Sequence, residues 1–248
     1  MTRVVPLFKE TNIPLITNRL RNFTPDIQKE ALLKVIAQKY RGSLYLLCKD
    51  LLGYSDITHF THDKIIHALE SKTKRKMIVV PRGCFKSSIG VVGFSIFCLL
   101  NNPDLRILID SEIYDNSKNF IREIRGKLES PKMITLFGDF KSNQWAEGSI
   151  TIKQRTKVLK ESSITASGVN TGKTGQHYDI IIHDDLNSNK NSQTKEMRDK
   201  VIEHYKLNTS ILEPEGTMVL IGTRYSADDC IGWVLENEIN VKGLLLER

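Results

Sequence analysis

From residue 76 onward, the sequence alternates short apolar runs with longer segments of helical periodicity. The apolar runs have the composition of buried strands and lie at 77–80, 106–110, 180–182 and 218–221. Helical patterns occupy the segment from Lys86 onward, 116–128, 197–208 and 231–237, and weaker strands are indicated at 149–153 and 163–166. Apolar strands followed by helices are typical of a parallel sheet covered by helices on both faces. The sequence therefore predicts an α/β fold.

The preceding residues have a different pattern, which is helical throughout. Thr24 has the character of an N-cap, Pro25 suits the first turn, and apolar residues recur at helical spacing to Gly53. A loop is expected at 56–60 and a short helix at 62–70. We therefore expect an N-terminal helical subdomain at 1–71 and an α/β core at 72–248.

The composition of the chain limits which binding partners and which cellular compartment we expect for it. The chain has 36 Lys and Arg against 29 Asp and Glu, a net charge of +7, and such a surplus favours polyanionic partners. No apolar stretch reaches the roughly 18 residues of a membrane helix, and no export signal is recognisable, so no membrane partner is expected. The four cysteines form no CxxC pair, which favours a reduced cytosolic setting without a zinc site.

A candidate phosphate-binding loop lies between the first apolar run and the helix that follows. In VPRGCFKSS at 80–88, backbone amides at the helix start would attract phosphate, Lys86 would reach the β- and γ-oxygens, and Ser87 would bind Mg²⁺. The pattern GxxxxGK[ST] is broken twice, because Val80 and Phe85 stand at its glycine positions. The alternative is a strand-to-helix turn with a surface lysine. The candidate loop residues are Pro81, Arg82, Gly83, Cys84, Phe85, Lys86, Ser87 and Ser88.

Two further strand ends carry polar residues suited to nucleotide chemistry. The run YDIIIHDD at 178–185 has the Walker B form, in which a buried strand delivers carboxylates to the carboxyl edge of the sheet, where ligands bind. Asp184 would hold Mg²⁺, and Asp185 would orient and deprotonate the attacking water, whereas a solvated Asp-Asp turn is the alternative. After 218–221, Thr223 could sense the γ-phosphate and Arg224 could report its loss, although a simple strand exit explains both.

With these motifs in order, the chain resembles the large terminase subunit of tailed bacteriophages, a motor ATPase that packages DNA. The resemblance extends over about 25–240. DITHFTHDKIIHALE at 56–70 is similar to the adenine-pocket segment, and RGCFKSS at 82–88 to a deviant Walker A in which an arginine precedes the lysine by four positions. TGKTG at 171–175 and YDIIIHDDL resemble the approach to Walker B, and IGTRYSADDCIGWVLE at 221–236 resembles the coupling motif and its helix.

This resemblance implies a P-loop NTPase with a mainly parallel central sheet, flanked by helices, that uses ATP and Mg²⁺ to translocate double-stranded DNA into a procapsid. The implied partners are a portal protein, a small terminase subunit and further copies in a homo-oligomeric ring, usually a pentamer. The implied location is the host cell cytoplasm. Large terminases also carry a C-terminal nuclease domain, which we expect to be absent from this chain, so no nuclease activity is expected from it.

The resemblance also implies roles for individual residues. Phe60 would stack on adenine and His62 would hydrogen-bond its edge, with core packing as the alternative for Phe60. Phe85 would be strained at positive φ, so we expect the loop to take a different local path that keeps Lys86 in place. Asp185 stands where many relatives have Glu, which predicts weak catalysis by the isolated domain. The trans-acting finger stays open among Arg82, Lys173, Arg122 and Arg125.

Two basic groups are candidates for contact with DNA. One comprises Lys72, Lys74, Arg75 and Lys76, and the other comprises Lys118, Arg122, Arg125 and Lys127. Surface solubility explains either group equally well. Two other functions remain open: a helicase-like, nucleic-acid-dependent P-loop ATPase and a non-hydrolytic nucleotide-binding scaffold.

Overall fold

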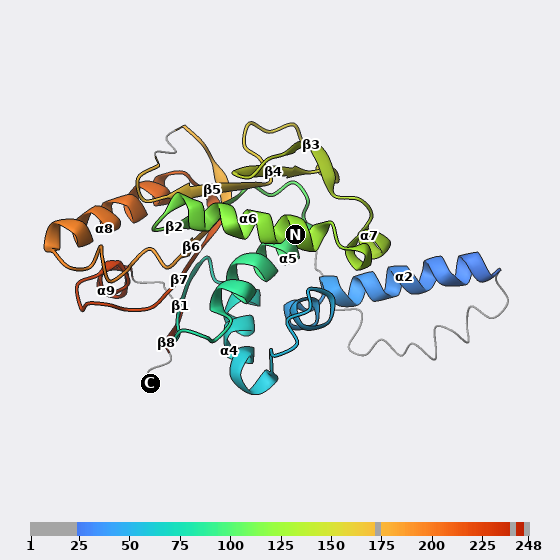
Figure 1. The fold of residues 1–248 in the computed structure, drawn as a ribbon, viewed down its shortest axis with the longest axis horizontal. Coiled ribbons are helices and arrows are strands. Elements are labelled where there is room, and N and C mark those ends of the chain that lie inside the picture. The colour runs from blue at the N-terminus through green and yellow to red at the C-terminus, as the bar shows by residue number, and fades with distance from the viewer. Residues whose placement is uncertain (1–23, 172–174, 239–241, 246–248) are drawn as a thin grey trace.

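A single eight-stranded sheet forms the centre of the molecule (Figure 1). The computed structural model describes residues 24–171, 175–238 and 242–245. The strand order is β3-β4-β5-β2-β6-β7-β1-β8. The strands are β1 (Arg75–Val79), β2 (Ile107–Ser111), β3 (Lys141–Trp145), β4 (Ser149–Ile152), β5 (Ile164–Gly168), β6 (Tyr178–Asp184), β7 (Leu212–Gly222) and β8 (Lys242–Leu245).

Neighbouring strands pair in parallel along the part of the sheet that runs β5-β2-β6-β7-β1-β8. At the other edge, β3 pairs antiparallel with β4, and β4 pairs antiparallel with β5. Successive side chains of a strand point to opposite faces, so an apolar run buried on both sides feeds two cores. Ile180 and Ile182 of β6 belong to the core on one face, and Ile181 belongs to the core on the other. This burial on both faces explains why β6 is a continuous apolar run.

Helices cover both faces of the sheet (Figure 1). The face that contains Ile180 packs against α4, η2 and α6, and the opposite face packs against α8 and α9. None of the helices in the described part of the chain is both long enough and apolar enough to cross a membrane. The helices are α2 (Pro25–Arg41), α3 (Leu44–Leu46), η1 (Leu47–Leu51), α4 (His59–Glu70), η2 (Ser88–Gly93), α5 (Phe94–Asn101), α6 (Tyr114–Leu128), α7 (Pro131–Phe137), α8 (Lys195–Ser210) and α9 (Cys230–Asn237).

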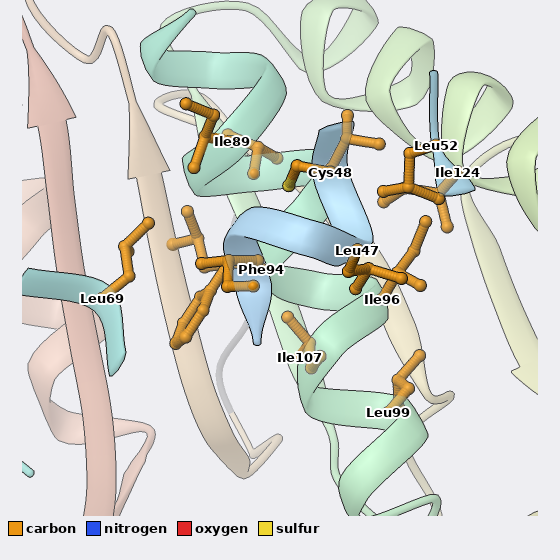
Figure 2. Packing of buried hydrophobic residues seen from close by; sticks show 14 of the residues in the cluster. Leu47, Cys48, Leu52, Leu69, Ile89, Phe94, Ile96, Leu99, Ile107 and Ile124 are labelled. Carbon is orange, nitrogen blue, oxygen red and sulfur yellow. The ribbon is translucent and has the colours of Figure 1, made fainter. Parts of the chain in front are cut away.

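The N-terminal helices share a hydrophobic core with the sheet (Figure 2). Leu47 and Cys48 of η1 belong to the same buried cluster as Phe94 of α5 and Ile107 of β2. Gly93 allows this close approach, because a Cβ at that position would collide with the sulfur of Cys48. The residues on the two sides of the expected boundary at residue 71 therefore share one continuous core. The division into a helical subdomain at 1–71 and an α/β core at 72–248 stays a prediction.

The predicted α/β class is confirmed, and each of the four apolar runs overlaps a strand and extends at most one residue beyond it. The weaker strands at 149–153 and 163–166 correspond to β4 and β5. Three elements were not predicted: β3, α7 and β8. β3 has the sequence KSNQW and lies at the exposed edge, so it lacks the apolar signal of a buried strand. The helix predicted at 62–70 begins earlier, at His59, after the N-cap Thr58.

Candidate functional site

Three motifs that are distant in sequence meet at Lys86. This lysine follows β1 at the start of the helical segment, and its buried Nζ lies 2.7 Å from Asp185 Oδ1 and 2.8 Å from Thr223 Oγ1. Asp185 comes directly after β6 and Thr223 directly after β7. Because β1, β7 and β6 are parallel neighbours, their carboxyl ends lie at the same edge of the sheet. The site expected at that edge is therefore assembled from the residues predicted for it.

Ser87 and Asp184 form a second contact beside this one. The Ser87 hydroxyl lies 2.9 Å from Asp184 Oδ1 and 3.0 Å from Oδ2. Only 5% of Asp184 is exposed, and its burial, together with the charge of Asp185, raises its pKa to about 7 despite the opposing effects of Ser87 and Lys86. A nearby cation would stabilise the ionised form of a buried carboxylate whose pKa is raised in this way. Hydroxyl and carboxylate oxygens are ligands suited to Mg²⁺, so this pair fits the predicted metal site.

The phosphate loop contains an unusual backbone conformation at Phe85. Its φ is 52°, in the left-handed region that a side chain other than glycine adopts at a cost of roughly 1–2 kcal/mol. The expectation that the loop avoids this conformation is therefore wrong. The ring of Phe85 packs against the core and lies edge-on to His62, with 5.6 Å between ring centroids. These contacts offset the strain and leave Lys86 at the start of the helix.

Asp185 also has a positive φ, of 45°. Its backbone N–H donates to the carbonyl of Ile221 at 2.9 Å, so the chain stays attached to β7 as it leaves β6. This turn separates the two carboxylates: Asp184 faces Ser87, and Asp185 faces Lys86. Strained backbone of this kind is concentrated at functional sites.

Arg82 connects the phosphate loop to the segment after β7. Its exposed guanidinium donates from Nη2 to the hydroxyl of Tyr225 at 2.7 Å, a partner that the sequence did not suggest. Arg224, in contrast, donates to the carbonyls of Ser226 and Ala227 in its own loop. A signalling role for Arg224 stays a prediction, and in this structure the arginine stabilises the turn that leads into α9.

The other loop residues surround this contact. Gly83 has a φ of 84°, which suits glycine, and is exposed together with Arg82. Pro81, Cys84 and Ser88 are each intermediate in exposure.

The two predicted adenine contacts differ in their surroundings. Phe60, at the start of α4, is 99% exposed, so the alternative of core packing is wrong. His62 is buried, its Nδ1 accepts from the backbone N–H of Thr58 at 3.0 Å, and its ring contacts Phe85. His62 is therefore adjacent to the phosphate loop, while Phe60 is available to a planar ligand. Their roles toward adenine remain predictions.

The candidates for a trans-acting finger are dispersed. Lys173 lies outside the described residues. Arg122, on α6, hydrogen-bonds Asn119 at 3.2 Å and lies 3.9 Å from a carboxylate oxygen of Glu147. Arg125 lies over the ring of Trp145, 5.9 Å from its centroid. The latter two have structural contacts on their own subunit, and the choice of finger stays open.

Most members of the two basic groups are bound within the chain. Lys76 is buried, donates to the carbonyls of Ala68 and Ser71, and has a pKa lowered to about 8 by burial. Lys74 contacts Glu215 and Lys118 contacts Asp115, while Lys127 donates to the carbonyl of Leu52. Their role as DNA contacts therefore has little support in the geometry.

A buried polar cluster beside the site was not predicted. Oδ2 of Asp110 in β2 lies 2.9 Å from His183 Nδ1, 2.8 Å from His204 Nε2 and 2.9 Å from Asn208 Nδ2. Burial opposes ionisation of Asp110, but the contacts with the two histidines lower its pKa to about 2. The cluster joins α8 to β2 and β6 directly behind Asp184. The polar residues inside the apolar strands, Asp110 and His183, were the available sequence signal.

Comparison with known proteins identifies the fold. No protein-family model matches the chain, and no curated protein matches it in sequence. A chain from a structure of a variant of dbp5 from S. cerevisiae, bound to nup159, gle1, ip6 and adp, has a TM-score of 0.51 at 10% identity and covers 83% of this chain and 52% of that chain. A second dbp5 structure, with gle1 and ip6, has a TM-score of 0.52 at 10% identity, covering 84% and 52%.

The large terminase ATPase domain of Thermus phage P74-26 matches with a TM-score of 0.43 and 16% identity, over 71% of this chain and 68% of that chain. The chain spans about half the length of the two dbp5-structure chains. The likeness to those two structures shows that this chain has the fold of a P-loop ATPase.

Proposed function

We propose that this chain is a Mg²⁺-dependent ATP hydrolase and the motor domain of a viral terminase large subunit, which translocates double-stranded DNA into a procapsid. The observation that carries the hydrolase proposal is the meeting of Lys86 with Asp185 and Thr223, beside the pair Ser87 and Asp184. These groups lie at the carboxyl edge of a P-loop ATPase fold, where nucleotides bind.

Lys86 has two successive partners in this proposal. In the structure it pairs with Asp185 and Thr223. A triphosphate bound by the loop amides would attract the ammonium group away from Asp185, because phosphate oxygens carry more negative charge. Asp185 would then be free to accept a proton from the water whose oxygen attacks the γ-phosphorus, while the bond to the ADP oxygen breaks. Arg82 would offset charge on the transferring phosphoryl group.

Ser87 and Asp184 would hold the metal. A bound Mg²⁺ supplies positive charge that neutralises phosphate oxygens and stabilises the ionised form of Asp184. Phe60 would stack on adenine, and His62 would shape the pocket behind the phosphate loop. Thr223 would sense the γ-phosphate, and the contact between Arg82 and Tyr225 offers a route from the nucleotide to the segment after β7.

The motor proposal rests on the residues of the sequence motifs and on their order along the chain, both of which resemble those of large terminases. It carries with it the partners of that family: a portal protein, a small terminase subunit, and a ring, usually pentameric, docked on a procapsid in the host cytoplasm. A basic residue would act across the subunit interface as the finger, and the candidates are Lys173, Arg82, Arg122 and Arg125.

A helicase-like ATPase is the second candidate, favoured by the likeness of the fold to dbp5. The two candidates differ in the nucleic acid that they engage. A packaging motor moves along an intact duplex, whereas a helicase-like enzyme separates strands. Phosphate release stimulated by duplex DNA, with displacement of a triplex-forming strand and no strand separation, would support the motor. Strand separation would overturn it in favour of the second candidate.

Phosphate release under steady-state conditions tests the hydrolase proposal. The assay is run at raised protein concentration, with Mg²⁺, and with and without DNA, because a shared site works only when subunits associate. We expect Lys86→Ala to abolish release, and Asp185→Asn to retain nucleotide binding while turnover stops. Lys195→Ala and Asp199→Asn, which change exposed residues of α8, are the matched controls. Retained turnover in Asp185→Asn would remove Asp185 from this role, and no release by the wild type would leave a nucleotide-binding scaffold.

A further inference from the structure

A basic cavity lies at the antiparallel edge of the sheet, away from the site described above. β3, β4 and the loop that follows β4 line an open hollow of about 560 Å³. Lys141, Lys153, Arg155 and Lys157 contribute four positive charges to its wall, and no acidic residue lines it. The two strands lie at the upper edge of the molecule in Figure 1. A concave surface of one charge sign concentrates ligands of the opposite sign.

The three lysines are exposed and weakly neutralised. Within the described ranges, Lys141 and Lys157 form no ion pair within 4 Å, and Lys153 lies 3.9 Å from a carboxylate oxygen of Asp139. Asp104 is close, and its oxygens accept hydrogen bonds from the backbone N–H groups of Thr156 and Lys157 and from the Thr156 hydroxyl. The lysine ammonium groups are thus left facing the cavity and the solvent.

Arg155 adds a partly buried positive charge to the wall. Its Nη1 donates to the carbonyl of Glu161 at 2.6 Å, and burial lowers the pKa of its guanidinium, an effect that nearby Asp104 and Asp179 oppose. Its Nε and Nη2 are shielded from solvent and have no hydrogen-bond partner among the described residues. Because these two donors are buried, Arg155 contributes its positive charge to the wall, and the exposed lysines are the groups that a ligand can contact.

We propose that this cavity binds the phosphate backbone of duplex DNA. The proposal rests on the proposed function in that it names the surface by which the ATPase holds its nucleic acid. Four cations without apolar anchors suit a linear polyanion, and contacts to phosphates do not depend on sequence, as a translocating enzyme requires. The two basic groups considered from the sequence are largely bound within the chain, whereas these lysines are free to reach a ligand.

The cavity is separate from the candidate nucleotide site. β4, β5 and β2 lie between β3 and β6. The loop after β4 leads into the start of β5, whose first residue, Ile164, pairs with Ile107 at the start of β2. The cavity loop therefore lies toward the amino ends of the parallel strands, and Lys86 lies at their carboxyl ends. Changes to the cavity lysines should leave basal ATP hydrolysis unaltered.

Affinity for a fluorescent 30-base-pair duplex, measured across a series of salt concentrations, tests the proposal. The variant is Lys141→Gln, Lys153→Gln and Lys157→Gln combined, and the control combines Lys29→Gln, Lys132→Gln and Lys195→Gln, which are exposed lysines on α2, α7 and α8. Each lost phosphate contact reduces the slope of log affinity against log salt by about 0.9, so the cavity variant should lose about 2.7. The control should keep the wild-type slope.

Replacing the same three lysines with arginine should retain binding, since the charges remain. Phosphate release without DNA, and thermal unfolding, report whether the glutamine variant is folded. Equal affinity and slope for the cavity variant and the control would overturn the proposal, as would a wild type that binds no duplex. If the wild type binds DNA through the cavity but releases no phosphate, the hydrolase proposal fails and this one stands. A preference for single-stranded DNA that is lost in the cavity variant would overturn the duplex as occupant.

Discussion

The buried carboxylate of Asp184 should make the stability of the nucleotide-free protein depend on pH. Its pKa is about 7 in the folded protein, against 3.8 for an ordinary Asp, so the folded state keeps a proton that the unfolded state has released. The contribution of Asp184 to stability therefore falls as pH rises between these two values and is lost above the higher one. From about pH 5 to about pH 8, this linkage lowers the free energy of unfolding by roughly 2–3 kcal/mol.

Asp184→Asn removes the titrating group and keeps an oxygen that can accept from Ser87. We expect the stability of this variant not to fall in this way, so that the difference in unfolding free energy between variant and wild type grows by roughly 2–3 kcal/mol over the same pH range. Urea denaturation at several pH values, without nucleotide or metal, measures it, and Asp199→Asn on α8 is the exposed control. Parallel pH curves for Asp184→Asn and the wild type would refute the reasoning, because Asp184 would then not titrate between the two values.

Three other changes test the geometry of the site and its support. Because φ at Phe85 is 52°, Phe85→Gly should be more stable than Phe85→Ala by about 1 kcal/mol in urea denaturation, the reverse of the order within a helix; equal stability would mean that the position carries no strain. Asn208→Ala removes a hydrogen bond to the buried Asp110 and should cost about 2 kcal/mol of unfolding free energy; a negligible loss would contradict the cluster's stabilising role. Thr223→Val removes the hydroxyl that contacts Lys86 and should slow phosphate release about tenfold or more while nucleotide binding persists; an unchanged rate would contradict its proposed role.

The central residues of the site could be predicted because strand ends are recognisable in sequence. Lys86 follows one apolar run, Asp185 a second and Thr223 a third, and parallel strands bring such ends to one edge. The contacts of Lys86 with the other two residues agree with this prediction. What the motifs could not indicate was that Lys86 contacts Asp185 and Thr223 directly, at 2.7 and 2.8 Å.

Other features depend on contacts between residues that carry no local signal. The left-handed Phe85 is tolerated where its ring packs against the core and His62, and the hydrogen bond from Arg82 to Tyr225 exists because two loops approach each other. The basic cavity was missed for a similar reason. β3 is a polar edge strand, and its lysine joins the others only after the chain has turned back through β4.

The sequence by itself determined the α/β class, the positions of the apolar strands along the chain and the polar residues that follow them. This is possible because strands buried on both faces must be apolar throughout, and this constraint is visible within each segment. Only the tertiary structure decided which of the charged residues are bound within the protein and which remain available to a ligand. Lys76 and Lys157 look alike in sequence, but one is buried against backbone carbonyls and the other is exposed beside a cavity, since burial depends on how distant segments pack.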